Sequence, residues 1–205
     1  MTPQGMRERR NGTLRYKTQG GYDEHLWTTS LLCSPGGPSP SVGNTAMADE
    51  PTVSITTEYL MTVYLQKEAA LSVDPSLLIS RDPAGGWVKG KVSGRVLDPS
   101  ADWARIIPSD ALRIRLDARV TIETDEHDLI YMTYNGRMRC DKETADRFRK
   151  GEAIKADDCY LINAPTFETK SEKYSWLSDV QAIGKMVEFK PGKGGHLIYD
   201  LFVVK

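Results

Sequence analysis

The stretch from Arg113 to Arg139 carries acid–base and hydrogen-bonding side chains at a regular spacing of two residues. In its first half apolar and polar residues alternate, so an extended strand would have one apolar face and one charged face. The apolar row is Ile114, Leu116, Ala118, Val120 and Ile122, and the polar row is Arg115, Asp117, Arg119, Thr121 and Glu123. A charged row turned into a protected interior would form a site for binding or acid–base chemistry. A charged row in water would be an ordinary sheet surface.

The sequence TDEHD (residues 124–128) separates this strand from a second one, and we expect the two strands to form a hairpin. Pairing Ile122 with Ile130 sets apolar residues opposite each other, whereas a slip of one residue would mix apolar with polar. The polar face then collects Asp117, Arg119, Thr121, Tyr131, Thr133 and Asn135. By alternation alone, a solvated polar face is the commoner arrangement. The pair Asp117 and Arg119, together with Tyr131, weakens that interpretation slightly, because such groups can neutralise one another inside a cavity. Periodicity leaves the orientation open, and our site prediction depends on the inward one.

The chain has 205 residues and a net charge of −1, which gives no basic footprint for nucleic acid or for a membrane surface. No apolar run approaches the roughly 18 residues that a membrane span needs. The cysteines Cys33, Cys140 and Cys159 are odd in number and lack CxxC spacing, so we expect reduced thiols rather than a disulfide or a zinc site. These features predict a soluble, cytoplasmic protein without nucleic-acid or membrane partners.

Residues 1–46 are rich in Gly, Pro, Ser and Thr and have no sustained periodicity. They predict a disordered leader, or non-native sequence upstream of a start at Met47. The best apolar stretch in this segment, LWTTSLLC, is broken by hydroxyl residues and makes a poor signal-peptide core. Residues 47–205 are expected to form one domain.

From about Val53 onward, β-branched and aromatic segments follow one another, separated by turn sequences such as DPSAD, IPSDA and KPGKGG. One helix is expected, with Asp141 as its N-cap and Gly151 as its stop. This pattern indicates an all-β protein and leaves a sandwich and a barrel open. The expected strands cover residues 54–65, 85–97, 113–124, 128–138, 159–169, 176–189 and 196–204.

Motifs for metal and nucleotide binding do not emerge from the sequence. The histidines His25, His127 and His196 cannot be placed together, so we expect neither a histidine metal site nor a nucleophilic triad. The sequence PGKGGH lacks P-loop spacing, and GGWVKG is not a dinucleotide fingerprint. Any catalysis is therefore expected to need no metal and no cofactor.

Several short motifs occur in the order in which the DUF3237 family has them, over roughly residues 56–204. They are GGWVKGKVSGRVL, Asp102-Trp103, LDARVTIETDEHDLIYMTYNGRM, YLINAPTFET and YSWLSDVQAIGK. The chain resembles this family, and the resemblance implies a closed antiparallel β-barrel with a central pocket lined in part by the hairpin. Some fungal members are cofactor-free isomerases and cyclases of natural products, including a fungal-type chalcone isomerase. The chain departs from the family pattern at DPSA, just before Asp102, so a substrate cannot be carried over.

Together, the resemblance and the polar face predict a cofactor-independent isomerase or cyclase, acting on a small aromatic, polyketide or terpenoid substrate in the barrel pocket. Arg119 would stabilise a developing oxyanion, Asp117 would orient Arg119, and Tyr131 would donate a hydrogen bond or relay a proton. Asp102 or Glu168 would act as the general base if burial raises its pKa. The residues expected to bind substrate are Trp103, Thr133, Asn135, Tyr174 and Trp176.

Each of these roles has a structural alternative. Trp103 and Trp176 could be ordinary core residues, and Asp102 could cap a turn. Glu168 could be solvated. Asp117 and Arg119 could form a structural ion pair. Two other functions therefore stay open at this point. One is a non-catalytic carrier of hydrophobic small molecules, and the other is a structural β-protein with a wet polar face. A homodimer is compatible with all three.

Overall fold

The computed structural model describes residues 53–205, so the expectations for residues 1–46, Cys33 and His25 lie outside the described part. The elements of the described part are β1 (Thr57–Lys67), β2 (Leu71–Ser72), β3 (Leu77–Arg81), β4 (Trp87–Gly90), β5 (Gly94–Ile106), β6 (Leu112–Thr124), β7 (Leu129–Cys140), α1 (Lys142–Arg149), β8 (Ile154–Lys155), β9 (Cys159–Thr169), the 3-10 helix η1 (Ser175–Asp179), β10 (Ala182–Lys190) and β11 (Gly195–Val204).

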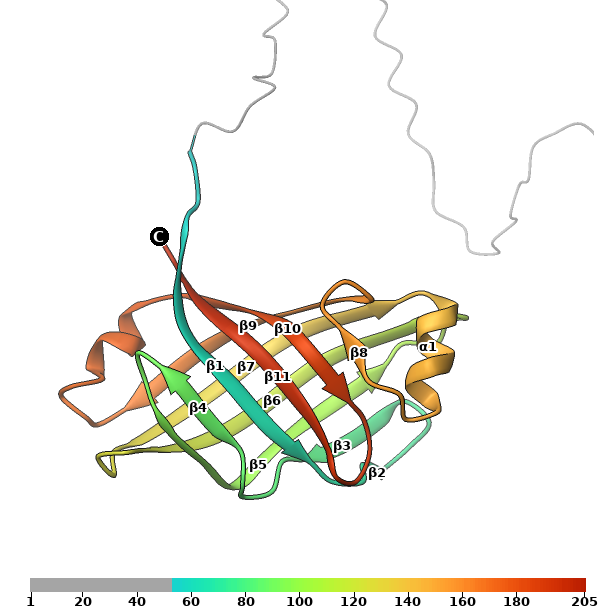
Figure 1. Cartoon of the computed structure of the whole chain (residues 1–205), viewed down its shortest axis with the longest axis horizontal. Coiled ribbons are helices and arrows are strands. Elements are labelled where there is room, and N and C mark those ends of the chain that lie inside the picture. The colour runs from blue at the N-terminus through green and yellow to red at the C-terminus, as the bar shows by residue number, and fades with distance from the viewer. Residues whose placement is uncertain (1–52) are drawn as a thin grey trace, which may run out of the picture. The chain divides into compact units, whose positions relative to one another are not determined.

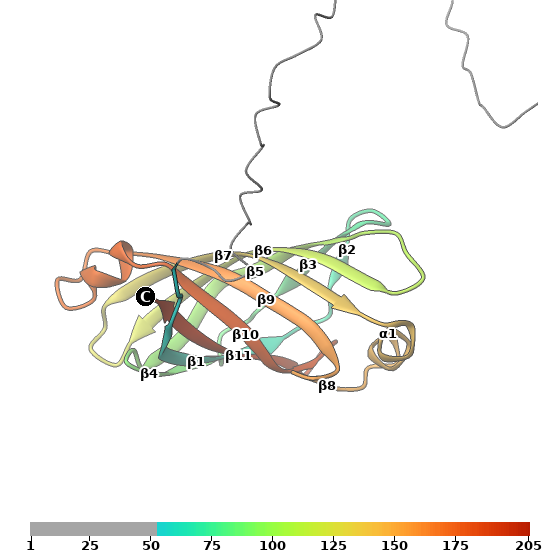
Figure 2. The ribbon, with the colours of Figure 1, turned by 90° about the horizontal axis from the view of Figure 1, so that it is seen from above.

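Eight strands close into an antiparallel barrel in the order β5-β4-β1-β11-β10-β9-β7-β6, because β6 also pairs with β5 (Figures 1 and 2). Strands β3 and β2 extend the sheet from β5, and β8 pairs with β10. Figure 1 shows α1 at one end of the barrel. The predicted closed barrel with one short α-helix is thus confirmed, and the sandwich is excluded.

The β6–β7 hairpin has the predicted register, with Ile122 opposite Ile130 and Asp117 opposite Asn135. Its predicted orientation is wrong, because the aliphatic row of β6 fills the interior and is at most 7% exposed. Burial of apolar surface stabilises by about 25 cal/mol per Å². Turning Asp117 and Arg119 inward would instead remove both charges from water, at a cost that their mutual attraction does not reliably offset.

Three strand boundaries differ from the sequence expectation. The segment GGWVKGKVSGRVL forms a hairpin between β4 and β5 rather than one bent strand. Gly90 has φ +152°, and a Cβ there would lie 2.4 Å from the carbonyl oxygen of Leu60, so the chain bends where only glycine fits. The DPSAD segment continues β5 through a register shift between Leu97 and Ala101 instead of forming a turn. The segment expected to begin a strand at Trp176 begins with η1.

The helix prediction is confirmed at both ends. The Asp141 carboxylate accepts a hydrogen bond from the backbone N–H of Thr144 at 2.8 Å, which satisfies a donor that the first helical turn leaves free. Gly151 follows the helix with φ +85°, in the left-handed region where glycine commonly stops a helix. Among residues 53–205, no helix is long and apolar enough to cross a membrane.

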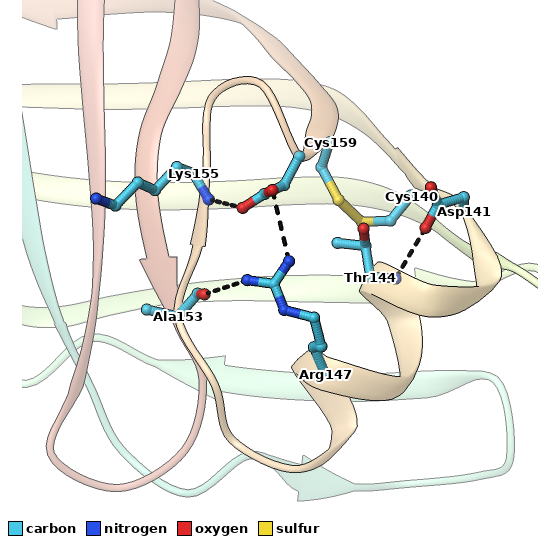
Figure 3. Close-up of a disulfide and its surroundings, with 8 residues drawn as sticks. Cys140, Asp141, Thr144, Arg147, Ala153, Lys155 and Cys159 are labelled. Atoms are coloured by element: carbon cyan, nitrogen blue, oxygen red, sulfur yellow. Dashed lines mark hydrogen bonds and ion pairs between the residues drawn. A yellow bond between two sulfur atoms is a disulfide. The ribbon is translucent and has the colours of Figure 1, made fainter.

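Cys140 ends β7, Cys159 begins β9, and the two lie opposite each other in the β7–β9 ladder. They form a disulfide with their Cα atoms 4.6 Å apart. Figure 3 shows this bond at the base of the segment that carries α1, where Arg147 pairs with Asp158 at 3.5 Å. The expectation of reduced thiols is therefore wrong for these two cysteines. Because disulfides persist mainly in oxidising compartments, the cytoplasmic location loses this support and stays a prediction.

Replacing both Cys140 and Cys159 by alanine, in a Cys33→Ser background, is expected to lower the free energy of unfolding by about 2–4 kcal/mol, because the cross-link restricts the unfolded chain. Urea unfolding followed by tryptophan fluorescence measures the difference. The Cys33→Ser protein is the control and should lose the same stability on addition of a reducing agent. Equal stability of the two proteins without reductant would contradict the disulfide.

Candidate functional site

Most inward positions of the described barrel hold the aliphatic residues of the core. Six buried polar side chains interrupt them, each at most 3% exposed. They come from five barrel strands (β1, β5, β7, β9 and β11) and from the loop after β3. We call these residues the inner polar cluster: Lys67, Asp82, Asp102, Tyr134, Asn163 and Tyr199.

Strand register brings the members of this cluster together. Asp102 of β5 and Tyr134 of β7 both lie opposite Ala118 of β6, so only a methyl group stands between them on the inner surface. Tyr199 of β11 reaches the same region from the far wall, and its ring meets that of Tyr134 edge to face, with centroids 5.8 Å apart. A carboxyl group and two phenols therefore share one part of the interior.

Asn163 of β9 lies between two glycines, with Gly136 of β7 opposite on one side and Gly184 of β10 on the other. A Cβ at Gly184 would lie 2.1 Å from Oδ1 of Asn163, so glycine provides the space that the amide occupies. Neither amide atom of Asn163 has a hydrogen-bond partner in the described chain. Buried polar atoms are nearly always hydrogen-bonded in proteins, to protein groups or to ordered water, so this amide can bind a water molecule or a polar ligand atom.

Lys67 and Asp82 form an ion pair between Nζ and Oδ1, with both side chains at most 2% exposed. The backbone N–H of Asp82 donates to the carbonyl oxygen of Ser100 at 2.9 Å, which fixes the loop that carries the carboxylate. Burial raises the pKa of Asp82, and the Lys67 ammonium opposes this rise. The second carboxylate oxygen, Oδ2, has no partner among residues 53–205. The pair thus supplies charge inside the barrel and keeps one free acceptor.

Asp102 is the member of the cluster best suited to exchange a proton. Its Oδ1 accepts a hydrogen bond from the backbone N–H of Asp117 at 3.0 Å. Burial raises the pKa of the Asp102 carboxyl to about 6, while Lys67 lowers it and the Asp82 carboxylate raises it further. A pKa close to the working pH lets a carboxyl group both accept and return a proton.

Tyr134 and Tyr199 keep their protons. Burial raises the pKa of both phenols well above the ordinary value of 10.0. The next cause is the neighbouring Tyr199 in the case of Tyr134, and Asp102 in the case of Tyr199. Neither hydroxyl has a hydrogen-bond partner within the part of the chain that the structure describes. Two neutral O–H donors therefore lie beside the Asp102 carboxylate, and such donors can stabilise negative charge that develops on a bound oxygen atom.

The residues predicted to carry the chemistry lie on the outer face. Arg119 and Asp117 have side chains 41% and 50% exposed and bond to each other at 3.0 Å, and Tyr131 is 40% exposed. The prediction that these three point into an enclosed space is wrong. Glu168 lies opposite Tyr131 on the same outer face and is exposed, so it lacks the burial that its predicted role as a base requires.

Four predicted residues nevertheless gather at an open groove of about 680 Å³ on the outside of the barrel: Trp103, Asp117, Arg119 and Asn135. The Arg119 guanidinium lies over the Trp103 ring, 4.7 Å from its centroid. Thr133 is also on the outer surface, where its hydroxyl and that of Thr166 are 2.9 Å apart. None of these five side chains reaches the inner polar cluster, and Asp117 contacts it only through its backbone N–H, which donates to Asp102.

Tyr174 and Trp176 lie in and beside η1, away from the groove. Tyr174 is 5% exposed, and its hydroxyl donates to Glu126 in the β6–β7 turn at 2.7 Å. Trp176 is partly buried and packs against the core. A role for either residue in binding substrate stays a prediction. Of the predicted site residues, Asp102 alone belongs to the inner polar cluster.

Sequence reasoning missed five members of the cluster: Lys67, Asp82, Tyr134, Asn163 and Tyr199. A signal for four of them is present, since each interrupts an apolar row at a spacing of two residues, as Lys67 does after Val63 and Leu65. Reading the apolar row as the interior would have marked these exceptions as inward-facing polar groups. Asp82 follows the end of β3 and has no such periodic signal.

Comparisons with known proteins agree with this architecture. The family model DUF3237, described as "Protein of unknown function", matches residues 55–204. A UPF0311 protein of Bradyrhizobium diazoefficiens is 34% identical over 95 residues, which are 46% of this chain and 61% of that protein. The chain therefore spans less than two thirds of the length of this relative.

Two solved structures show the same fold. The crystal structure of a conserved protein of unknown function from Rhodopseudomonas palustris has a TM-score of 0.68 and 26% identity, and the match covers 76% of this chain and all of that one. The crystal structure of an enzyme from Penicillium herquei has a TM-score of 0.52 and 20% identity, over 78% of this chain and all of that one. At this identity, the second match supports the fold alone.

The raised pKa of Asp102 predicts a specific pH dependence of stability. Its folded-state pKa of about 6 lies above the ordinary 3.8, so the folded protein holds the proton more tightly than the unfolded chain. This contribution is complete below about pH 4 and is lost as the pH rises through about 6. Between pH 4 and pH 7, the wild type should therefore lose up to about 3 kcal/mol more unfolding free energy than Asp102→Asn.

Urea unfolding at a series of pH values measures this difference. Asp110→Asn, which changes an exposed carboxylate just before the adjacent strand β6, is the matched control and should follow the wild-type curve. Parallel curves for the wild type and Asp102→Asn would contradict a raised pKa at Asp102.

Proposed function

Because the chain belongs to the DUF3237 family, we propose that its inner polar cluster binds a small organic molecule and catalyses a cofactor-independent isomerisation or ring closure. The observation that carries this proposal is the meeting, inside one barrel, of a carboxyl group of pKa about 6 with two buried phenols whose hydroxyls have no hydrogen-bond partner among residues 53–205. Proton transfer within a carbonyl compound needs a base of suitable pKa and donors for the charged oxygen.

In the proposed reaction, the Asp102 carboxylate removes a proton from a substrate hydroxyl or from a carbon next to a carbonyl group. Tyr134 and Tyr199 donate hydrogen bonds to the carbonyl oxygen, on which negative charge develops. After the ring has closed or the double bond has moved, the proton returns from Asp102 to the carbon skeleton. The product is an isomer of the substrate, so the reaction consumes no oxidant, reductant or co-substrate.

The other members of the cluster position the reacting groups. The charge of Lys67 lowers the pKa of Asp102 and so favours the basic form of the carboxylate before the reaction begins. The amide of Asn163 can donate to and accept from polar atoms of the substrate. In the proposed complex, a hydrocarbon or aromatic skeleton would pack against apolar inner residues such as Val120 and Met132, which would hold it in its reactive conformation.

The fold comparison is consistent with a catalytic use of this scaffold. The protein from Penicillium herquei, whose barrel is similar, is described as an enzyme. Its reaction is not assigned to this chain, because fold similarity alone does not carry function. The proposal rests on the inner polar cluster and names a small-molecule substrate as the partner.

A 2′-hydroxychalcone is a suitable probe, because its ring closure needs a deprotonated hydroxyl, a polarised enone and no cofactor. We expect the protein to accelerate this closure, measured by the loss of chalcone absorbance and by the chirality of the product. Asp102→Asn and Tyr134→Phe are each expected to lower kcat/KM by about 100-fold or more, since each removes a general base or an oxyanion donor.

Tyr131→Phe is the matched control, because it removes a phenol from the outer face of the same strand and should leave kcat/KM unchanged. Circular dichroism of all variants verifies that they fold. Tight binding of hydroxylated chalcones without turnover, measured by fluorescence titration, would overturn catalysis and favour the carrier function. If the protein neither binds nor converts any of a series of hydroxylated aryl ketones, the proposal is wrong.

A further inference from the structure

Three arginines stand side by side on the outer face of the barrel, on three adjacent strands. Arg115 of β6 is the direct partner of Arg105 of β5 on one side and of Arg137 of β7 on the other. We call these residues the arginine row. Like charges placed directly opposite each other destabilise a sheet, so the row has a cost that the fold itself does not require.

Counter-charges near the row are few. Arg105 approaches Asp74 at 3.7 Å, and Arg137 donates to the carbonyl oxygen of its neighbour Gly136 at 2.8 Å. Within residues 53–205, no carboxylate lies at ion-pair distance from Arg115 or Arg137. The centre of the row therefore presents guanidinium groups whose charge the described part of the chain does not neutralise.

The row lies in the outer groove of about 680 Å³. A fourth cation, Arg119, also lines this groove and is held in place from two sides. Its guanidinium lies over the Trp103 ring at 4.7 Å and bonds to the Asp117 carboxylate at 3.0 Å. The lining thus holds four arginines and one carboxylate, so the groove is positively charged and part of that charge is fixed in position.

We propose that this groove binds the diphosphate group of a small molecule, a function beyond the one proposed for the inner polar cluster. Guanidinium groups bind phosphate oxygens through paired N–H donors. Neighbouring strands are about 4.8 Å apart, so the row spans about 10 Å, which suits two linked phosphates better than one. The volume of the groove, about 680 Å³, is in the range of small-molecule sites. A stable protein partner needs instead a contact surface of about 800 Å² on each side.

Inorganic pyrophosphate, titrated into the full chain by calorimetry at low ionic strength, tests the site. We expect saturable binding that weakens as salt is added. Arg115→Gln is expected to raise Kd at least about tenfold, a loss of about 1.4 kcal/mol. Arg139→Gln is the matched control, because it removes the same charge from the same face of β7, outside the groove. It should change Kd less than about threefold, since only screened, long-range attraction is lost.

Arg115→Gln also relieves like-charge repulsion, so its thermal midpoint should be no lower than that of the wild type. If it unfolds, Arg105→Gln serves as the second variant. Equal weakening by Arg115→Gln and Arg139→Gln would overturn the site, since the barrel would then attract anions only through its general field.

Competing anions test the ligand class. Citrate that binds as tightly as pyrophosphate would overturn the preference for phosphate. A DNA duplex that binds more tightly than pyrophosphate would overturn the small-molecule assignment. Absence of saturable pyrophosphate binding would overturn the proposal as a whole. None of these measurements uses turnover at the inner polar cluster, so the failure of one proposal leaves the other untouched.

Discussion

The pairing of β5 with β6 is the constraint on which the inner polar cluster depends, because it closes the sheet. Closure divides every barrel strand into a row that faces a common interior and a row that faces water. Within that interior Asp102 loses its hydration, which raises its pKa to about 6, and the phenols of Tyr134 and Tyr199 stay protonated. On an open sheet the same side chains would be solvated and would titrate as ordinary surface groups.

Period-two alternation was sufficient to predict the β6–β7 hairpin, since one register alone pairs Ile122 with Ile130. Alternation does not tell which row is inside. The free energy of burying the aliphatic row decides it, and Arg119 therefore faces outward. The buried site follows the opposite rule. Lys67, Tyr134 and Tyr199 are single polar residues within apolar rows, so their positions can be read from the sequence once those rows are taken as the interior.

Other features depend on contacts that one sequence does not encode locally. Asp82 lies outside any regular strand and meets Lys67 where the backbone N–H of Glu68 donates to the carbonyl oxygen of Arg81. Cys140 and Cys159 face each other only in the β7–β9 register, after a helix has intervened. Arg105 and Arg115 are each unremarkable as exposed strand residues, and their like-charge contact arises from the register between two strands. The hairpin was predictable because its partners are neighbours in sequence, whereas these pairs are not.

The Cys140–Cys159 bond encloses α1 and β8 in a covalent ring anchored on two barrel strands. A protease that cut the exposed turn at Gly151 would therefore leave both fragments joined, and each barrel strand would keep its neighbours. The ring also tolerates added length, because lengthening a surface loop costs little entropy. New surface features can thus be grafted onto this end of the barrel without disturbing the inner polar cluster.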